Sequence, residues 1–152
     1  MLTAAQKTLV QDSFAIITPI ADDAAALFYQ RLFELDPSLR HMFPEDMTGQ
    51  RKKLMQMLTA AVKGLDRLDQ LVPVLQDMGR RHVGYGVTDA HYETVGAALL
   101  WTLEQGLGPA FTQEVRDAWA EAYLVLATVM RRSAARTSAG LPRPSGSSKA
   151  QP

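Results

Sequence analysis

The sequence predicts an all-α protein of about seven helices, and three observations support that fold class. Apolar residues recur three and four positions apart along most of the chain, which is the spacing of helices with one buried face. Almost no segment alternates apolar and polar residues as a half-buried strand does. The connections between the periodic segments are short and contain Pro or Gly. We therefore expect helices packed around one core.

The first half of the chain predicts three helices and a short turn. The first helix follows Thr3, with Gln6 three residues later as in a capping box, and it ends near Pro19. A second amphipathic helix covers residues 20–35. A short turn that begins with Asp-Pro and a loop follow, and a third helix covers residues 48–65.

The second half predicts three further helices. One covers residues 70–83. The next begins at Thr88 or Asp89 and ends near Gly106, and the last long helix begins at Thr112. These helices complete one predicted domain over residues 1–136. Residues 137–152 are rich in Pro, Gly and Ser, so we expect them to form a disordered tail.

Length and composition agree with one ordinary globular domain. The chain has 152 residues, of which 47% are hydrophobic and 21% charged, and this suffices for a substantial core. Sixteen Lys and Arg residues balance sixteen Asp and Glu residues. This charge does not suggest a nucleic acid or a membrane surface as a partner. The absence of cysteine excludes disulfides, thiolate nucleophiles, iron–sulfur clusters and thioether-linked haem.

The N-terminal segment predicts neither a signal peptide nor a membrane anchor. Lys7 and Asp12 interrupt its apolar residues, whereas a signal peptide has a continuous apolar region. The sequence has no run of about eighteen apolar residues that could span a bilayer. We therefore expect a cytoplasmic protein.

One histidine lies on the apolar face of the helix predicted at residues 70–83. That face consists of Leu71, Leu75, Met78 and His82. A histidine in this position is either a core residue or a metal ligand, and the position alone favours the core residue. The other histidines, His41 and His91, share no metal-binding spacing with it. A metal at His82 would therefore have to arrive inside a cofactor that needs one protein ligand, as haem does.

Several motifs, taken in their order along the chain, are similar to those of the globin family. They are LFYQRLF with Tyr29, PSLRHM before Phe43, GQRKKLM with Gln50, MGRRH with His82, and then HYETVG, LGPAFT and AWAEAY. Over about residues 2–134 the chain resembles single-domain bacterial haemoglobins, the haem domains of flavohaemoglobins and neuroglobin. The resemblance implies a globin fold that binds haem b non-covalently.

The resemblance also implies which residues hold the haem. His82 becomes the axial ligand of the iron, and the backbone carbonyl of Met78 accepts its second ring N–H. Phe43 matches the phenylalanine that packs on the porphyrin, although a core aromatic in a loop would be buried in the same way. Further matches to the pocket wall are Leu54, Val87, Tyr92 and Val95. Whether Arg81 or Lys53 contacts the haem propionates stays open.

Tyr29 and Gln50 match a distal pair that recurs in bacterial globins. Gln50 and Leu54 are four residues apart, so both face one side of their helix. Each distal donor could stabilise bound dioxygen by about 1–2 kcal/mol in a dry pocket. The alternatives are a core tyrosine whose hydroxyl bonds to the backbone and a glutamine that faces solvent. The pair together favours tight dioxygen binding.

The resemblance leaves two classes of function. The first is reversible binding of dioxygen for storage, transport or sensing, with nitric oxide and carbon monoxide as further ligands. The second is an enzyme, either a nitric oxide dioxygenase or a peroxidase-type haem protein, that relies on a separate reductase. Tyr92 matches a proximal tyrosine of flavohaemoglobins, but the glutamate expected near Ala134 is missing from RRSAAR. Binding is therefore favoured. We expect His41 and His91 to lie at the surface.

Overall fold

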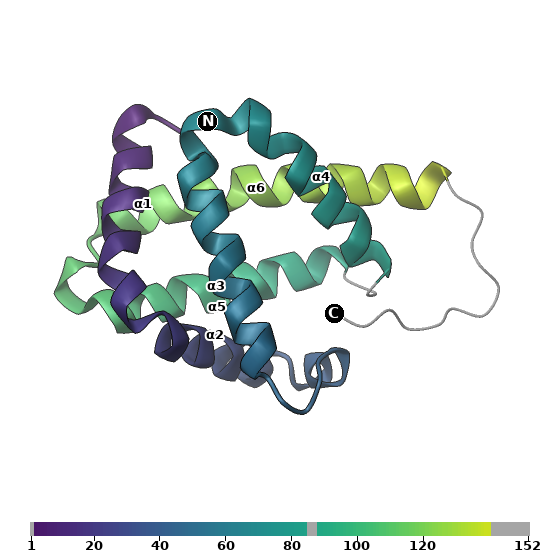
Figure 1. The fold of residues 1–152 in the computed structure, drawn as a ribbon, viewed down its shortest axis with the longest axis horizontal. Coiled ribbons are helices and arrows are strands. Elements are labelled where there is room, and N and C mark those ends of the chain that lie inside the picture. Colours follow the sequence, from purple (N-terminus) through teal and green to yellow (C-terminus); the bar gives the residue numbers. More distant parts are fainter. Residues whose placement is uncertain (1, 85–87, 141–152) are drawn as a thin grey trace.

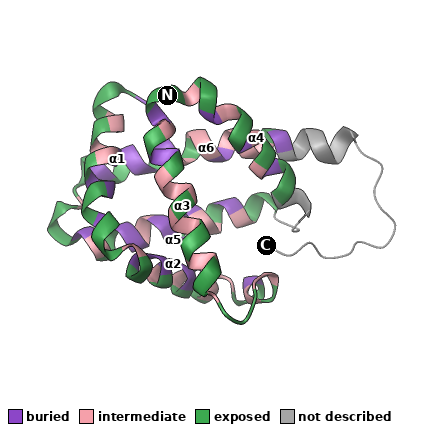
Figure 2. Cartoon of the chain, in the orientation of Figure 1, coloured by how far each residue is buried: buried purple, intermediate pink, exposed green. Residues whose placement is uncertain are grey.

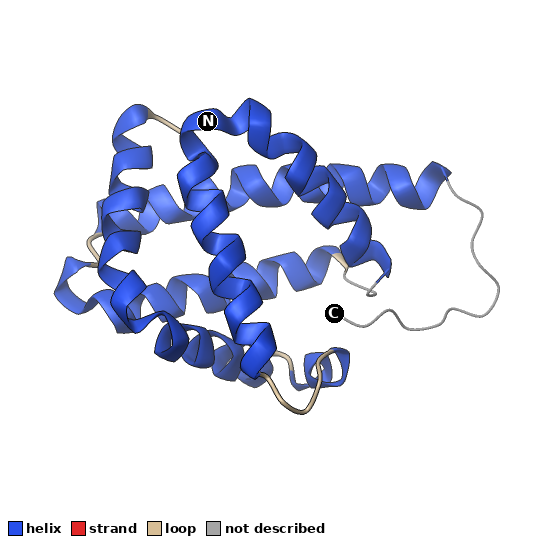
Figure 3. Ribbon diagram, viewed as in Figure 1, coloured by secondary structure: helices blue, strands red, loops and turns tan. Residues whose placement is uncertain are grey.

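The computed structural model describes residues 2–84 and 88–140, without the side chains of residues 82–84 and 134–140. Within these ranges the chain folds into helices and no strand occurs, which confirms the predicted all-α class (Figure 3). The α-helices are α1 (Ala4–Ile17), α2 (Ala21–Leu35), α3 (Thr48–Lys63), α4 (Leu68–Gly84), α5 (Asp89–Leu107) and α6 (Gln113–Gly140). The 3₁₀ helices are η1 (Thr18–Ile20), η2 (Pro37–Met42), η3 (Gly64–Arg67) and η4 (Gly108–Ala110).

The helices form two layers. In Figure 1, α5 and α6 run side by side along the molecule, and α3 crosses in front of them. Helix α1 packs on α6, α2 packs on α5 and α3, and α4 packs along α6. Residues from α1, α3, α5 and α6 surround one apolar cavity, so α3 lies directly over the α5/α6 layer.

Two predicted helix starts carry the caps that the sequence indicates. The Thr3 hydroxyl accepts from the Gln6 backbone N–H at 3.0 Å, and the Gln6 side chain accepts from the Thr3 N–H at 2.9 Å. These two bonds satisfy donors that a helix N-terminus leaves unpaired. The second start is at Thr88, whose backbone N–H donates to Nδ1 of His91 at 3.0 Å. His91 is therefore half-buried as part of a cap, not fully exposed as predicted.

The observed elements differ from the predicted ones at three places. The described residues contain six α-helices instead of about seven, because the turn after Asp36 is the 3₁₀ helix η2. The helix predicted to end at residue 65 changes to 3₁₀ geometry at Gly64. Helix α6 continues past residue 136, the predicted end of the domain, to Gly140. The rest of the predicted tail, residues 141–152, lies outside the described residues.

The core lies where the inner faces of the helices meet, as the purple segments of Figure 2 show. Val10 and Leu65 are its most completely buried large side chains, at 0% and 1% exposure. Trp119 is also buried, and its indole N–H donates to the Ser13 hydroxyl at 2.8 Å. This bond joins α1 to α6. In the part of the chain that is described, no helix has both the length and the apolar character needed to cross a membrane.

Candidate functional site

Tyr29 lies in a cluster of four aromatic rings. It is buried in α2 with 6% of its surface exposed. Its ring centroid is 5.1 Å from that of Phe28, 6.0 Å from that of Phe33 and 5.5 Å from that of Phe43. Phe28 and Phe33 belong to the same helix, whereas Phe43 arrives from the segment after η2. The fold therefore brings two residues of the predicted site, Tyr29 and Phe43, into contact.

Gln50 completes this group from helix α3. Its side-chain amide donates to the Tyr29 hydroxyl oxygen at 3.2 Å. Gln50 is half-buried, and among the described residues the Tyr29 hydroxyl bonds to Gln50 and not to the backbone. Because the phenolic oxygen is the acceptor, the phenolic proton remains able to donate. No acceptor for this proton occurs among the described residues.

The surroundings of Tyr29 keep its hydroxyl protonated. Burial raises the pKa of the Tyr29 phenol above 10, since the charged phenolate loses solvation, and the Gln50 hydrogen bond only partly opposes this shift. At neutral pH the group is therefore a neutral hydrogen-bond donor. It lies in an environment where hydrogen bonds are electrostatically stronger than in water.

Tyr92, on α5, provides a second buried phenol. Its backbone carbonyl accepts from the Tyr123 hydroxyl at 2.6 Å, which ties α5 to α6. The guanidinium of Arg131 lies 5.6 Å from the Tyr92 ring centroid and pairs with Asp89 at 3.2 Å. Burial raises the pKa of the Tyr92 phenol. Among the described residues its hydroxyl has no hydrogen-bond partner, which is uncommon for a buried polar atom.

Helix α4 carries the stripe that leads to His82. Leu71 and Leu75 are buried, and Met78 is half-buried. The side chain of His82 lies outside the described residues, as does Val87. Within the described residues, no group of three His, Asp or Glu side chains could hold a metal ion.

The other predicted wall residues have less specific positions. Leu54 and Val95 are half-buried and pack against the core. His41 is exposed. Arg81 is also exposed and pairs with Asp77 at 2.9 Å, so its guanidinium already has a carboxylate partner.

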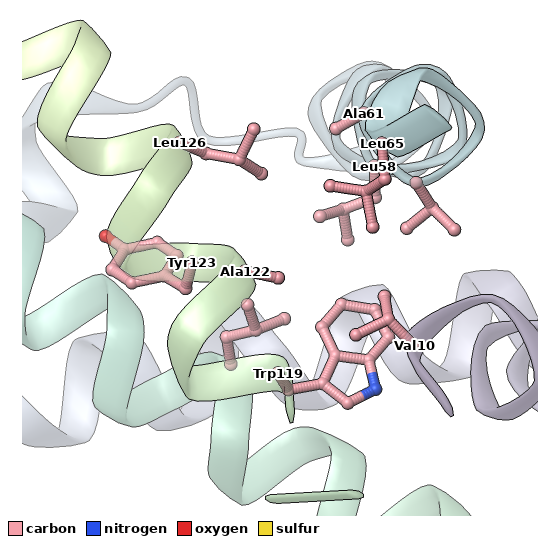
Figure 4. Close-up of a pocket in the computed structure, with 10 residues that line it drawn as sticks. Val10, Leu58, Ala61, Leu65, Trp119, Ala122, Tyr123 and Leu126 are labelled. Carbon is pink, nitrogen blue, oxygen red and sulfur yellow. The ribbon is translucent and has the colours of Figure 1, made fainter. Parts of the chain in front are cut away.

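The cavity drawn in Figure 4 is separate from this site. It has a volume of about 30 Å³ and is lined by apolar surface from α1, α3, η3, α5 and α6, including Val10, Leu65 and Trp119. None of the described residues of the predicted site lines it. Tyr123 borders the cavity with its ring and reaches Tyr92 with its hydroxyl. The cavity is therefore a packing gap in the core behind the site.

Three residues that support the predicted site were not predicted from the sequence: Phe33, Arg40 and Tyr123. Phe33 lies four residues after Tyr29, so the helical spacing could have placed it beside Tyr29. Arg40 and Tyr123 gave no such signal. Arg40 bonds to carbonyls three to five residues further along the chain, and Tyr123 bonds to a carbonyl of α5. Both depend on the folded geometry of the backbone.

The fold and the site define an all-α protein with two buried phenols whose hydroxyl groups keep unused hydrogen-bonding capacity. A model of the globin family matches residues 26–130. The chain belongs to the globin family. Membership of this family implies a haem cofactor and the binding of diatomic ligands.

Relatives cover most of this chain. It is 32% identical to neuroglobin from Danio rerio, over 89% of this chain and 94% of the relative. It is 31% identical to a flavohemoprotein from Vibrio cholerae and 30% identical to one from Bacillus subtilis, over 85% and 78% of this chain. The matched regions are only 34% and 31% of those two proteins, so the chain spans about a third of the flavohemoproteins.

A solved structure is similar over almost its whole length. It is an engineered carbene transferase, described as a putative nitric oxide dioxygenase from Rhodothermus marinus. Its TM-score is 0.82 at 28% sequence identity, and the match covers 92% of this chain and 98% of that chain.

Proposed function

We propose that the protein binds dioxygen reversibly and tightly through non-covalent haem b. The observation that carries this proposal is the buried Gln50–Tyr29 hydrogen bond, which leaves the phenolic proton of Tyr29 without an acceptor in the described residues. Haem, when bound, supplies an iron that takes up one diatomic ligand reversibly. His82 would ligate the iron, and Phe43 would pack against the macrocycle.

The residues present fit such a group. Two buried phenols, Tyr29 and Tyr92, each keep a hydrogen-bonding capacity that the described protein does not use. Both remain neutral, because burial raises their pKa values. Neutral donors among aromatic rings suit an apolar macrocycle with a small polar ligand better than they suit a charged substrate.

Tyr29 and Gln50 would act on the ligand as one unit. The Gln50 amide fixes the phenolic oxygen, and this orients the phenolic proton toward the ligand. A hydroxyl that accepts one hydrogen bond is polarised by it, so the hydrogen bond that this hydroxyl donates becomes stronger. Dioxygen develops negative charge when it binds, whereas carbon monoxide develops much less. The pair should therefore discriminate between the two ligands.

Removal of the Tyr29 hydroxyl tests the proposal. Tyr29→Phe keeps the ring, so we expect dioxygen to dissociate roughly tenfold faster, as for a lost bond of about 1–2 kcal/mol. Gln50→Leu should act in the same direction. Carbon monoxide dissociation, measured on the same samples by stopped-flow ligand replacement, should change little in both variants.

Tyr123→Phe controls for the loss of a half-buried phenolic hydroxyl that supports Tyr92 and not Tyr29. Its hydroxyl bonds to a backbone carbonyl and not to Gln50, so its loss should leave the dioxygen-to-carbon-monoxide ratio unchanged. Parallel changes for both gases in Tyr29→Phe would show that Tyr29 acts sterically, and the proposal would then be wrong.

A nitric oxide dioxygenase is the second candidate, because a structural neighbour carries that description and two relatives are flavohemoproteins. We expect the oxygenated protein to consume one equivalent of nitric oxide and then stop. The measurement is nitric oxide consumption at an electrode. Sustained nitric oxide consumption with a nicotinamide nucleotide alone would show that the protein is itself a nitric oxide dioxygenase. Sustained consumption only after a separate reductase is added would show a dioxygenase that depends on a partner protein.

A further inference from the structure

The Arg40 side chain spans the segment that follows η2. Its Nη1 group donates to the backbone carbonyls of Phe43 at 3.3 Å and Pro44 at 2.9 Å. Its Nη2 group donates to the carbonyl of Glu45 at 3.1 Å. One guanidinium therefore bonds to three consecutive carbonyls. A guanidinium presents several donors in a fixed planar fork, whereas an ammonium has three donors at one point on a flexible stem.

Arg40 is the protein donor to these carbonyls among the described residues. Residues 43–47 form neither helix nor strand, so no regular backbone pairing reaches them. Within residues 2–84 and 88–140, no other donor bonds to the carbonyls of Phe43, Pro44 and Glu45. The Phe43 N–H in turn donates to the Arg40 carbonyl at 3.2 Å. Arg40 therefore bonds to both the N–H and the carbonyl of Phe43.

The same guanidinium also contacts the aromatic cluster. Its central carbon lies 5.4 Å from the Phe33 ring centroid, within the range of a cation–π contact. Phe33 in turn lies 5.6 Å from Phe43 and 6.0 Å from Tyr29, between ring centroids. Arg40 therefore reaches Phe43 through the backbone and Tyr29 through one intervening ring.

We propose that Arg40 is a positioning residue that holds Phe43 and Tyr29 in place by clamping residues 43–45 and the Phe33 ring. The inference rests on the proposed ligand pocket at Tyr29, and it adds a residue that does not itself touch the ligand. The loop that Arg40 clamps leads directly into α3, which carries Gln50. Loss of the Arg40 bonds should therefore let Gln50 move more freely and weaken its hydrogen bond to Tyr29.

The test compares Arg40→Met with Arg31→Met in the haem-loaded protein. Arg31 is a matched control, since its guanidinium lies 5.3 Å from the Trp101 ring and pairs with Glu34 but makes no bond to residues 43–45. We expect hydrogen–deuterium exchange at the hydrogen-bonded amides of Phe43 and Thr48 to become roughly tenfold faster in Arg40→Met, as for loss of charge-assisted bonds. Dioxygen release should become several-fold faster, and carbon monoxide release should change less. Arg31→Met should change none of these.

Arg40→Lys separates charge from geometry and is a milder substitution if Arg40→Met folds poorly. Lysine keeps the cation but not the fork, so it should reproduce most of the effect. Wild-type behaviour of Arg40→Lys would overturn the clamp. Faster exchange without faster dioxygen release would overturn the positioning role. If the unsubstituted protein binds no haem, the proposed function fails, and the exchange measurement still decides whether Arg40 holds the loop.

Discussion

The Ser13 hydroxyl shows how much one buried polar group can contribute. It accepts the indole N–H of Trp119 at 2.8 Å and donates to the Leu9 carbonyl at 2.6 Å. Both Ser13 and Trp119 are buried, at 5% and 3% exposure. A lone indole N–H in such a place would have no access to water, so the bond stabilises the fold chiefly by preventing an unpaired donor.

We therefore expect Ser13→Ala to lower the free energy of unfolding by about 1–3 kcal/mol, because the Trp119 N–H loses its acceptor. Urea or thermal unfolding measures the change. Thr102→Val is the matched control. Its hydroxyl is also buried but bonds only to the Ala98 carbonyl of its own helix, so its loss should cost less. Equal effects in the two variants would contradict this account.

At the scale of helices, the crossing of α4 and α6 depends on a glycine. Gly79 is buried, and a Cβ atom added there would overlap the backbone oxygen of Met130 and lie 2.9 Å from its carbonyl carbon. Backbone cannot move aside as a flexible side chain does. Gly79 therefore permits α4 to approach α6 closely, three residues before His82 on the same helix.

Gly79→Ala should destabilise the protein by about 1–3 kcal/mol, as for overpacking of a tight contact. Gly49→Ala provides the control, since a Cβ atom there meets nothing within 4 Å. Because alanine has the higher helix propensity, the control should be neutral or stabilising by up to about 1 kcal/mol. Thermal unfolding of both variants measures this difference, and a neutral Gly79→Ala would show that the helices can separate without loss.

For the whole molecule, three phenols with raised pKa values make stability depend on pH in the alkaline range. Burial raises the pKa values of Tyr29, Tyr92 and Tyr123 above 10, and the negative charge of an ionised Tyr92 raises that of Tyr123 further. The folded protein therefore holds these three protons more tightly than the unfolded chain does. Their contribution to stability is fully present below pH 10 and is lost as the pH rises above that value.

The prediction is that these three phenols ionise only when the protein unfolds. Ultraviolet difference absorbance of phenolate should show a cooperative step above pH 10 that coincides with loss of helical circular dichroism. Removal of one phenol, in Tyr123→Phe, should reduce the amplitude of that step. If all four tyrosines of the chain titrated near pH 10 in a fully helical protein, the three phenols could not be buried as described.

The sequence alone determined the helices, two of their caps and the Tyr29–Gln50 pairing. The helical repeat and the Thr3 cap are local patterns, so they can be predicted from neighbouring residues. The pairing followed from resemblance to a family. Only the tertiary structure decided that Arg40 clamps three carbonyls, that Tyr123 holds the Tyr92 carbonyl and that Gly79 meets Met130. Such contacts join segments far apart in sequence or depend on one loop geometry, and no local spacing encodes them.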